Sequence, residues 1–403
     1  MKLHRNLALG ILSGLERTLV EAYPASDTLK QLLKSNPGWG SRDRRIIAQI
    51  FYDIVRQKRF FHALSGSENT SLNLWKMIGY WMIINDFTLP DWEEFKNLQS
   101  DEIRQKAVVL LGERKYKYSI PDWLDAMGLE AFGTSTWEKE IAALNTPAEL
   151  VVRVNTQKIG VEKLKDLLKN KYDITTRELA DYPQALVFEK NQSLQLIKEY
   201  REGFFEVQDA NSQMIAPWLN ASAGKYYIDA CAGAGGKSLH LANLTKDAAR
   251  IAALDVYPVK LDALRRRCYR NDVQSVQTVL VEKKEDLSAV RGNADGVLID
   301  APCSGLGVLK RKPDAKWNMN PKRIDEIIET QKKILQTYAP FIKKGGILVY
   351  ATCSIFPQEN QHQIIDFLET ETGRFFELEK EQTYFSHQTG FDGFYCARLL
   401  RKM

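Results

Sequence analysis

Residues 296–307 read GVLIDAPCSGLG, and this stretch decides the fold prediction. An apolar run that ends in Asp300 predicts a buried strand with a carboxylate at its C-terminal end, where ligands bind in open parallel α/β sheets. Residues 345–354, GGILVYATCS, repeat the pattern and place Cys353 after a second strand, as Cys303 follows the first. Two cysteines behind two strands indicate thiol chemistry beside a bound cofactor.

The pattern continues through residues 212–403. Strand-like runs occur at 226–231, 250–256, 276–281, 295–301 and 345–352, and helical patterns occur between them at 237–244, 258–271 and 321–342. Strands that alternate with helices predict right-handed βαβ units and a parallel sheet. We expect the tail at 391–400 to add an antiparallel edge strand.

Two further domains are predicted before this one. Residues 1–112 keep apolar residues at helical spacing, most clearly at 42–56, where Ser41 is a suitable N-cap. Residues 113–211 combine strand-like runs with a short amphipathic helix at 161–169, which predicts a small α/β unit.

Composition narrows the class of protein. The 403 residues allow two or three domains, and no apolar run is long enough to cross a bilayer. The N-terminus lacks the apolar core of a signal peptide, so we expect a cytoplasmic protein. The five cysteines are odd in number, widely spaced and free of Cys-x-x-Cys pairs, which argues against a disulfide framework and against a metal site.

Positive charge is concentrated in two places. The net charge is +5, yet residues 1–60 alone hold eleven Lys/Arg and five Asp/Glu, and residues 301–323 hold six Lys/Arg and one Asp. A basic excess near a candidate site favours a polyanionic partner, with nucleic acid the first candidate.

The candidate cofactor loop is residues 226–238, YYIDACAGAGGKS, which reads as a strand, a glycine-rich turn and a helix start. Asp255 ends the next strand, where an acid suits a ribose diol. A P-loop would need Gly rather than Cys231 at its first position, and the glycine spacing does not match a dinucleotide fold. A methyltransferase that uses S-adenosylmethionine fits best, and the P-loop and dinucleotide alternatives stay open at this point.

The cysteine segments resemble one family closely. DAPCSG at 300–305 and ATCS at 351–354, in this order, are similar to the RsmB/NSUN family of RNA 5-methylcytosine methyltransferases. CAGAGGK at 231–237 resembles that family's CAAPGGK loop and departs from it at Gly233 and Ala234. Weaker similarities at 153–156, 207–212, 311–317 and 356–360 extend the resemblance over nearly the whole chain.

The resemblance implies a fold and an activity. It implies a Rossmann-like methyltransferase domain at 212–403, preceded by a small α/β RNA-binding subdomain at 113–211 and a helical NusB-like domain at 1–112. The implied reaction is methyl transfer from S-adenosyl-L-methionine to carbon 5 of a cytosine in RNA, with 16S rRNA as the expected substrate. We expect a monomer that needs neither metal nor membrane. A P-loop nucleotide hydrolase and a non-catalytic RNA-binding scaffold are the alternatives.

The resemblance also assigns roles to residues. Cys353 would attack the base, Cys303 would assist proton removal and release, and Asp300 would hold the base. The cofactor would be held by Cys231, Ala232, Gly233, Ala234, Gly235, Gly236, Lys237, Asp255, Asp300 and Asp286, with Glu282 as the alternative to Asp286. Arg311, Lys312 and Lys316 are the expected phosphate contacts.

Overall fold

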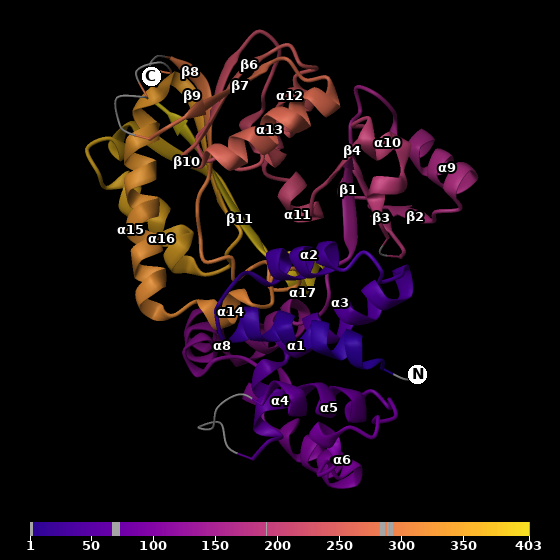
Figure 1. The fold of residues 1–403 in the computed structure, drawn as a ribbon. Coiled ribbons are helices and arrows are strands. Elements are labelled where there is room, and N and C mark those ends of the chain that lie inside the picture. Colours follow the sequence, from indigo (N-terminus) through magenta and orange to yellow (C-terminus); the bar gives the residue numbers. More distant parts are fainter. Residues whose placement is uncertain are drawn as a thin grey trace. The chain divides into compact units, whose positions relative to one another are not determined.

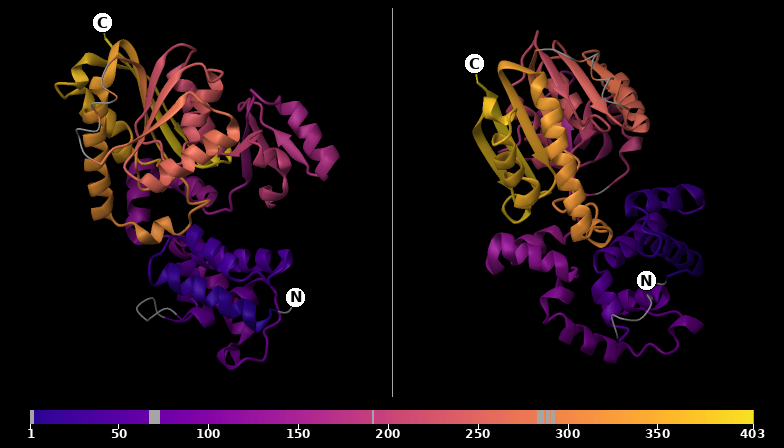
Figure 2. Two further views of the ribbon diagram at one scale, coloured as in Figure 1. Left: turned by 45° about the horizontal axis from the view of Figure 1, so that its top comes forward. Right: turned by 90° about the vertical axis from the view of Figure 1, so that its left-hand side faces the viewer.

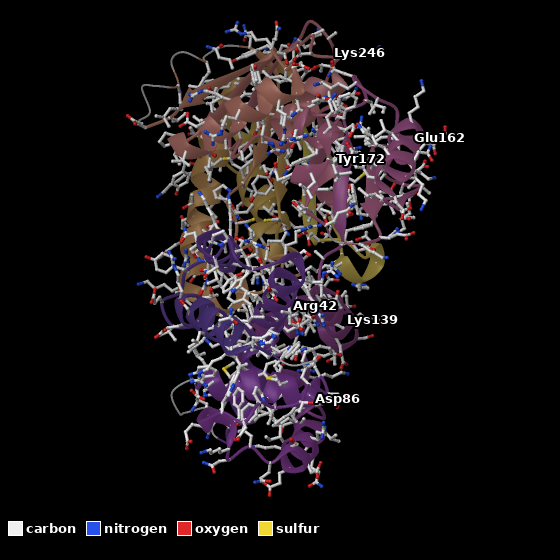
Figure 3. All side chains as sticks on the ribbon, turned by 45° about the vertical axis from the view of Figure 1, so that its right-hand side comes forward. Arg42, Asp86, Lys139, Glu162, Tyr172 and Lys246 are labelled. Atoms are coloured by element: carbon white, nitrogen blue, oxygen red, sulfur yellow. The ribbon has the colours of Figure 1, made fainter. Side chains whose placement is uncertain are left out.

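The computed structural model describes residues 3–66, 73–190, 192–282, 287, 290 and 293–402. The chain forms two compact units. The helical unit comprises residues 1–146 and 308–322, and the sheet unit comprises residues 147–307 and 323–403. Charged side chains lie on the outside of both units, as Arg42 and Lys139 do on the first and Glu162 and Lys246 do on the second (Figure 3). Within the described residues, no helix has the length and apolar composition that spanning a bilayer requires.

The helical unit is built around an apolar core. The α3 helix supplies much of it, because Ile47, Ile50, Phe51 and Ile54 recur on one face and are fully buried. The helix starts at Ser41, so Gly40 rather than Ser41 is its N-cap, and the Asp43 carboxylate accepts the Gly40 amide at 3.1 Å. The helices of this part of the chain are α1 (Arg5–Leu19), α2 (Ala25–Ser35), α3 (Ser41–Arg56), α4 (Lys58–Ala63), α5 (Leu74–Ile84), α6 (Ser100–Leu110), α7 (Arg114–Lys117) and α8 (Asp122–Leu144).

The helical unit therefore extends beyond the predicted boundary at residue 112. The α8 helix belongs to it and breaks at Gly133, whose φ of 70° and ψ of 167° are not helical. Residues 308–322, with the short helix α14 (Ala315–Asn318), also pack here. Arg56 donates to the carbonyls of Leu309 and Lys310 at 3.0 and 2.8 Å, and the Trp317 indole donates to the Val55 carbonyl at 2.7 Å.

The sheet unit contains a small antiparallel sheet and a large mixed sheet. The small sheet has the order β2-β3-β1-β4, formed by β1 (Leu150–Val154), β2 (Thr176–Glu178), β3 (Ala185–Phe188) and β4 (Phe205–Val207). Leu164 and Leu168 of α9 (Val161–Tyr172) pack on it. The short helices α10 (Lys198–Arg201) and α11 (Ala210–Gln213) follow. The strand-like runs expected in this part of the sequence form β1, β3 and β4.

The large sheet has seven strands in the order β10-β11-β9-β8-β5-β6-β7. The five predicted strands are confirmed as β5 (Tyr226–Asp229), β6 (Arg250–Asp255), β7 (Val276–Leu280), β8 (Ala294–Asp300) and β9 (Ile342–Thr352), and their ladders are parallel. The tail strand β11 (Phe394–Arg401) is antiparallel but does not form the edge, because β10 (Phe376–Tyr384) pairs with its outer side.

Helices cover both faces of the large sheet (Figures 1 and 2). On one face, α12 (Gly236–Leu244) and α13 (Pro258–Asn271) bury Leu239, Leu261 and Leu264 against Ala253 of β6. On the other, α15 (Pro321–Tyr338) and α16 (Gln361–Leu368) bury Leu335 and Ile364 against the strands, and the short helix α17 (Ser386–Thr389) precedes β11. This Rossmann-like arrangement confirms the predicted fold class.

Candidate active site

The two cysteines meet at the C-terminal ends of β8 and β9. These strands are parallel and pair Asp300 with Ala351, so the residues that follow each strand emerge side by side. The sulfurs of Cys303 and Cys353 lie 3.1 Å apart, and the Cys353 amide donates to the Cys303 sulfur at 3.3 Å. Both cysteines are free and half-buried.

The surroundings distinguish the two thiols. The hydrogen bond to Cys353, together with burial and the nearby charges of Cys353 and Glu359, raises the pKa of Cys303 well above its usual range. Either sulfur could donate in the 3.1 Å contact, so the pair can share one proton. A thiolate rather than a thiol is the reactive nucleophile, so a pair in which Cys303 holds the proton leaves Cys353 as the attacking atom, as the family resemblance implies.

Lys237 brings positive charge to the same place. Its ammonium lies 2.6 Å from the Asp300 carboxylate and 5.5 Å from the centre of the Phe394 ring. Burial lowers the pKa of Lys237, but the charge and hydrogen bond of Asp300, followed by the charge of Cys353, outweigh it and raise the pKa overall. The lysine thus stays charged between the carboxylate and the thiol pair.

Glu359 links the two cysteine segments. This carboxylate is 0% exposed and accepts the Ser304 amide at 2.7 Å, the Ser304 hydroxyl at 2.6 Å and the Ser354 hydroxyl at 2.5 Å. Gln331 of α15 donates to it at 3.3 Å. Ser304 follows Cys303 and Ser354 follows Cys353, so one side chain fixes both segments. Glu359 was not among the predicted site residues.

The glycine-rich loop after β5 has the conformation that a close ligand requires. Gly233 and Gly235 have φ values of +55° and +84°, and a Cβ at Gly235 would lie 2.0 Å from Leu264. The Asp255 carboxylate accepts the Gly233 amide at 2.8 Å and the Tyr257 amide at 2.9 Å. Each carboxylate oxygen has a second lone pair, so Asp255 can still bind a diol.

The loop also leaves room for a nucleoside cofactor. A Cβ placed at Gly233 or at Gly236 would meet no atom within 4 Å, so the backbone faces open space there. Asp255 is the acceptor for a ribose diol beside this space. The Asp300 carboxylate and the Lys237 ammonium supply one negatively and one positively charged group. The donors and acceptors present therefore fit an adenosyl cofactor with an amino-acid tail.

Asp229, at the end of β5, is a second buried acid that the sequence did not single out. It is fully buried and accepts the Ser238 hydroxyl at 2.6 Å. Burial raises the pKa of Asp229 to about 7, against the Ser238 hydrogen bond, which lowers it.

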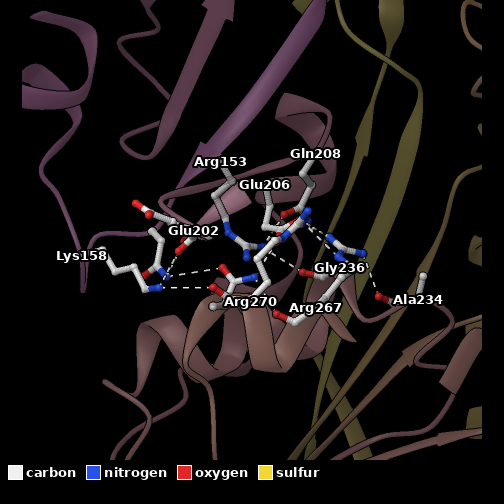
Figure 4. A network of polar contacts seen from close by, with 12 residues as sticks. Arg153, Lys158, Glu202, Glu206, Gln208, Ala234, Gly236, Arg267 and Arg270 are labelled. Atoms are coloured by element: carbon white, nitrogen blue, oxygen red, sulfur yellow. Dashed lines mark hydrogen bonds and ion pairs between the residues drawn. The ribbon is translucent and has the colours of Figure 1, made fainter. Parts of the chain in front are cut away.

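Two arginines, one from the small sheet and one from α13, hold the glycine-rich loop (Figure 4). Arg267 donates to the Ala234 carbonyl at 2.7 Å, and Arg153 of β1 donates to the Gly236 carbonyl at 2.9 Å. Arg153 also donates to Gln208. The Glu206 carboxylate, which is 3% exposed, accepts from Arg267 at 2.9 Å and also binds Arg270.

The remaining predicted residues lie in different environments. Burial, followed by the charges of Asp229 and Asp300, raises the pKa of Cys231, so its thiol is not a nucleophile. Asp286 lies outside the described residues, and Glu282 is exposed at the end of β7. The described residues contain no group of three or more His, Cys, Asp or Glu side chains that could hold a metal ion.

The three predicted phosphate contacts belong to the helical unit. Lys312 is exposed and Arg311 is half-buried. Lys316 is 1% exposed and donates to the Tyr118 carbonyl at 3.4 Å and to Asn145 at 3.0 Å, and burial lowers its pKa well below the usual range. Lys316 therefore has a structural position, since a phosphate at the surface could not reach its ammonium.

The chain is similar to known proteins over most of its length. A family model described as 16S rRNA methyltransferase RsmB/F matches residues 216–400, and the ferredoxin-like domain of the RsmF/B-like methyltransferases matches residues 120–195. A "Ribosomal RNA small subunit methyltransferase B" of Pasteurella multocida is 32% identical over 79% of this chain and 74% of its own length. A "Probable ribosomal RNA small subunit methyltransferase B" of Synechocystis is 34% identical over 67% of this chain, and the match spans 60% of that relative.

Solved structures share the fold. PH0851 superposes with a TM-score of 0.83 at 23% identity and covers 99% of both chains. NSun6 from Pyrococcus horikoshii, in its structure with SFG, has a TM-score of 0.64 at 21% identity and covers 70% of this chain and 98% of its own.

Proposed function

Because the chain belongs to the RsmB/F family of 16S rRNA methyltransferases, we propose that it methylates carbon 5 of a cytosine in 16S rRNA through a covalent bond to Cys353. The observation that carries the proposal is the 3.1 Å pair of sulfurs at the C-terminal ends of the neighbouring parallel strands β8 and β9. Carbon 5 of cytosine is too electron-poor to take a methyl group directly, so a nucleophile must first add to the ring.

The two cysteines divide the reaction between them. The methyl donor is S-adenosyl-L-methionine, which supplies an electrophilic methyl group when bound. The Cys353 thiolate forms a bond to carbon 6 of the base, and the displaced electron pair lets carbon 5 bond to the methyl group, whose bond to the donor's sulfur breaks so that a neutral thioether leaves. With its sulfur bonded to carbon 6, Cys353 no longer supplies the hydrogen bond and the charge that raised the pKa of Cys303. Cys303 loses its proton to water, accepts the proton of carbon 5, and the bond between sulfur and carbon 6 breaks. One proton is released overall.

Asp300 and Lys237 act on the charge that this addition creates. Their side chains lie 2.6 Å apart at the end of β8, next to the thiol pair. The carboxylate can accept from the amino group of the cytosine, and the ammonium stabilises the negative charge that builds on the ring as sulfur adds. A base in this position must leave its stack. Arg311 and Lys312 are proposed to contact the phosphates of the flanking RNA.

Trapping of the RNA adduct tests the assignment of the two thiols. With S-adenosylmethionine present, Cys303→Ala is expected to give a covalent RNA complex that survives a denaturing gel, since release is blocked. Cys353→Ala is expected to give neither the complex nor methylated RNA, and Cys268→Ala, which changes a buried thiol on α13, serves as the control with normal turnover. Methylation by Cys353→Ala would refute the proposed roles. The P-loop and scaffold alternatives both predict no transfer of label from S-adenosylmethionine to RNA in the unmodified protein.

A further inference from the structure

The helical unit has a surface pocket that the proposed reaction does not use. Its volume is about 230 Å³, and it lies at the start of α4, at the start of α8 and against the 308–322 segment. All its walls belong to the helical unit. The lining residues are Lys58, Arg59, His62, Pro121, Asp122 and Trp317.

Lys58 carries a charge in this pocket that nothing in the described chain neutralises. The side chain is half-buried, and burial lowers its pKa. Its ammonium lies 5.4 Å from the centre of the Trp317 ring, and no described carboxylate pairs with it. A partly desolvated ammonium without a counter-ion is costly, and an anion in the pocket would offset that cost.

The other walls favour an anion as well. Arg59 adds a second positive charge and is held in place by Asp122 at 2.6 Å and by the Ile120 carbonyl at 2.7 Å. The Asp122 side chain is 80% exposed, so solvent screens its charge more than that of Arg59, which is 12% exposed. His62 adds a buried Nε2 atom that has no hydrogen-bond partner among the residues that the structure describes.

Trp317 gives the pocket a fixed wall. The indole N–H donates to the Val55 carbonyl at 2.7 Å, so the ring is held at the end of α3, beside Lys58. Trp317 comes from the segment that leaves the sheet unit directly after the Cys303 loop. The walls therefore come from three segments, at 58–62, 121–122 and 317, which distinguishes this pocket from one exposed lysine.

We propose that this pocket binds a backbone phosphate of the RNA substrate, with Lys58 as its ion-pair partner and Arg59 beside it. The basic excess of residues 1–60 makes a polyanion the natural source of the phosphate. The proposal rests on the proposed function for the identity of the RNA. Lys58 and Arg59 would add to the predicted contacts of Arg311 and Lys312, which belong to the same unit.

RNA binding without the cofactor tests this contact independently of methyl transfer. The probe is a 16S rRNA transcript, and its Kd for the full chain is measured by filter binding between about 0.05 and 0.3 M salt, a roughly sixfold range. Lys58→Gln removes the charge and keeps the length of the side chain. Lys34→Gln, on the exposed side of α2, makes the same change of charge in the same unit and is the control.

One lost phosphate contact lowers the slope of log Kd against log salt by roughly 0.7, which corresponds to about fivefold weaker binding at 0.1 M salt. We expect this change for Lys58→Gln, a return to normal binding for Lys58→Arg, and unchanged binding for Lys34→Gln. Equal effects of Lys58→Gln and Lys34→Gln, or no effect of either, would overturn the pocket as the site. If the unmodified protein bound RNA with the Lys58-dependent slope but transferred no methyl group, the proposed function would fail and the pocket would stand.

Discussion

Glu359 is the residue whose replacement tests most directly whether the two cysteine segments are held as a pair. The change Glu359→Gln keeps the size of the side chain and replaces one oxygen with an NH₂ group. The remaining oxygen can still accept the Ser304 amide, which donates at 2.7 Å. The Ser304 and Ser354 hydroxyls, at 2.6 and 2.5 Å, then face an amide in place of a carboxylate.

The expected cost follows from these three hydrogen bonds. A hydrogen bond to a charged group contributes roughly 1.5–3 kcal/mol and a neutral one roughly 0.5–1.5 kcal/mol, so each of the three loses about 1 kcal/mol. Burying an amide is less costly than burying a carboxylate, which returns part of this loss. We therefore expect the local structure to lose about 2 kcal/mol. Since small displacements of reacting groups reduce rates strongly, kcat should fall at least about tenfold.

Hydrogen exchange measured by mass spectrometry shows which segments of the chain lose stability. A cost of about 2 kcal/mol corresponds to exchange about 30-fold faster for local opening in peptides that cover 300–307 and 351–360. Glu369→Gln, the same change at an exposed position just after α16, is the control and should leave exchange unaltered. Normal protection and normal kcat in Glu359→Gln would show that the carboxylate does not position the cysteines.

Two further predictions concern the glycine-rich loop and Asp229, the buried acid at the end of β5. Arg267→Met removes the hydrogen bond to the Ala234 carbonyl and should raise the Kd for S-adenosylmethionine several-fold in calorimetric titration, whereas Arg265→Met, on the same helix, should not. Burial raises the pKa of Asp229 to about 7, so the folded state keeps a proton that the unfolded state loses above about pH 4. The stability that this protonation contributes is complete below about pH 4 and is lost towards pH 7, at up to about 1.4 kcal/mol per pH unit. The free energy of unfolding, measured in urea at pH 5 and pH 8, should therefore fall between the two pH values in the unmodified protein and not in Asp229→Asn. The same fall in both proteins would contradict this prediction.

The strands that carry the site were predictable because their signals are local. Apolar runs that end in a polar residue fix where β8 and β9 stop, and the parallel register then brings Asp300, Cys303 and Cys353 to one edge. β10 was missed, because seven of its nine residues are exposed or half-exposed and charged or polar, as in FELEKEQTY at 376–384. Among the described strands, β10 pairs with β11, and the local sequence pattern of residues 376–384 does not reveal this pairing.

The 308–322 segment shows why residue type alone misplaces function. Lys316 stands in a basic run that is typical of a phosphate-binding surface, yet its ammonium is satisfied by the Tyr118 carbonyl and by Asn145. Those two groups are distant in sequence, so the burial of Lys316 is a tertiary effect. The burial of Glu359 is also a tertiary effect, because it is hydrogen-bonded to Ser304, which is 55 residues away in the sequence. The segment 356–360 alone does not reveal this contact.

The departure of the glycine-rich loop from the CAAPGGK pattern has a structural counterpart. A proline at position 234 would restrain the turn through its ring, because it fixes φ. Here the turn is restrained from outside, by Arg267 on the Ala234 carbonyl and Arg153 on the Gly236 carbonyl. Glu206 holds Arg267, and the charges of Arg267 and Arg270 overcome burial and keep the pKa of Glu206 below its usual value. A restraint of this kind depends on the small sheet, since Arg153 and Glu206 lie on β1 and β4, and it makes that sheet a support of the proposed cofactor site.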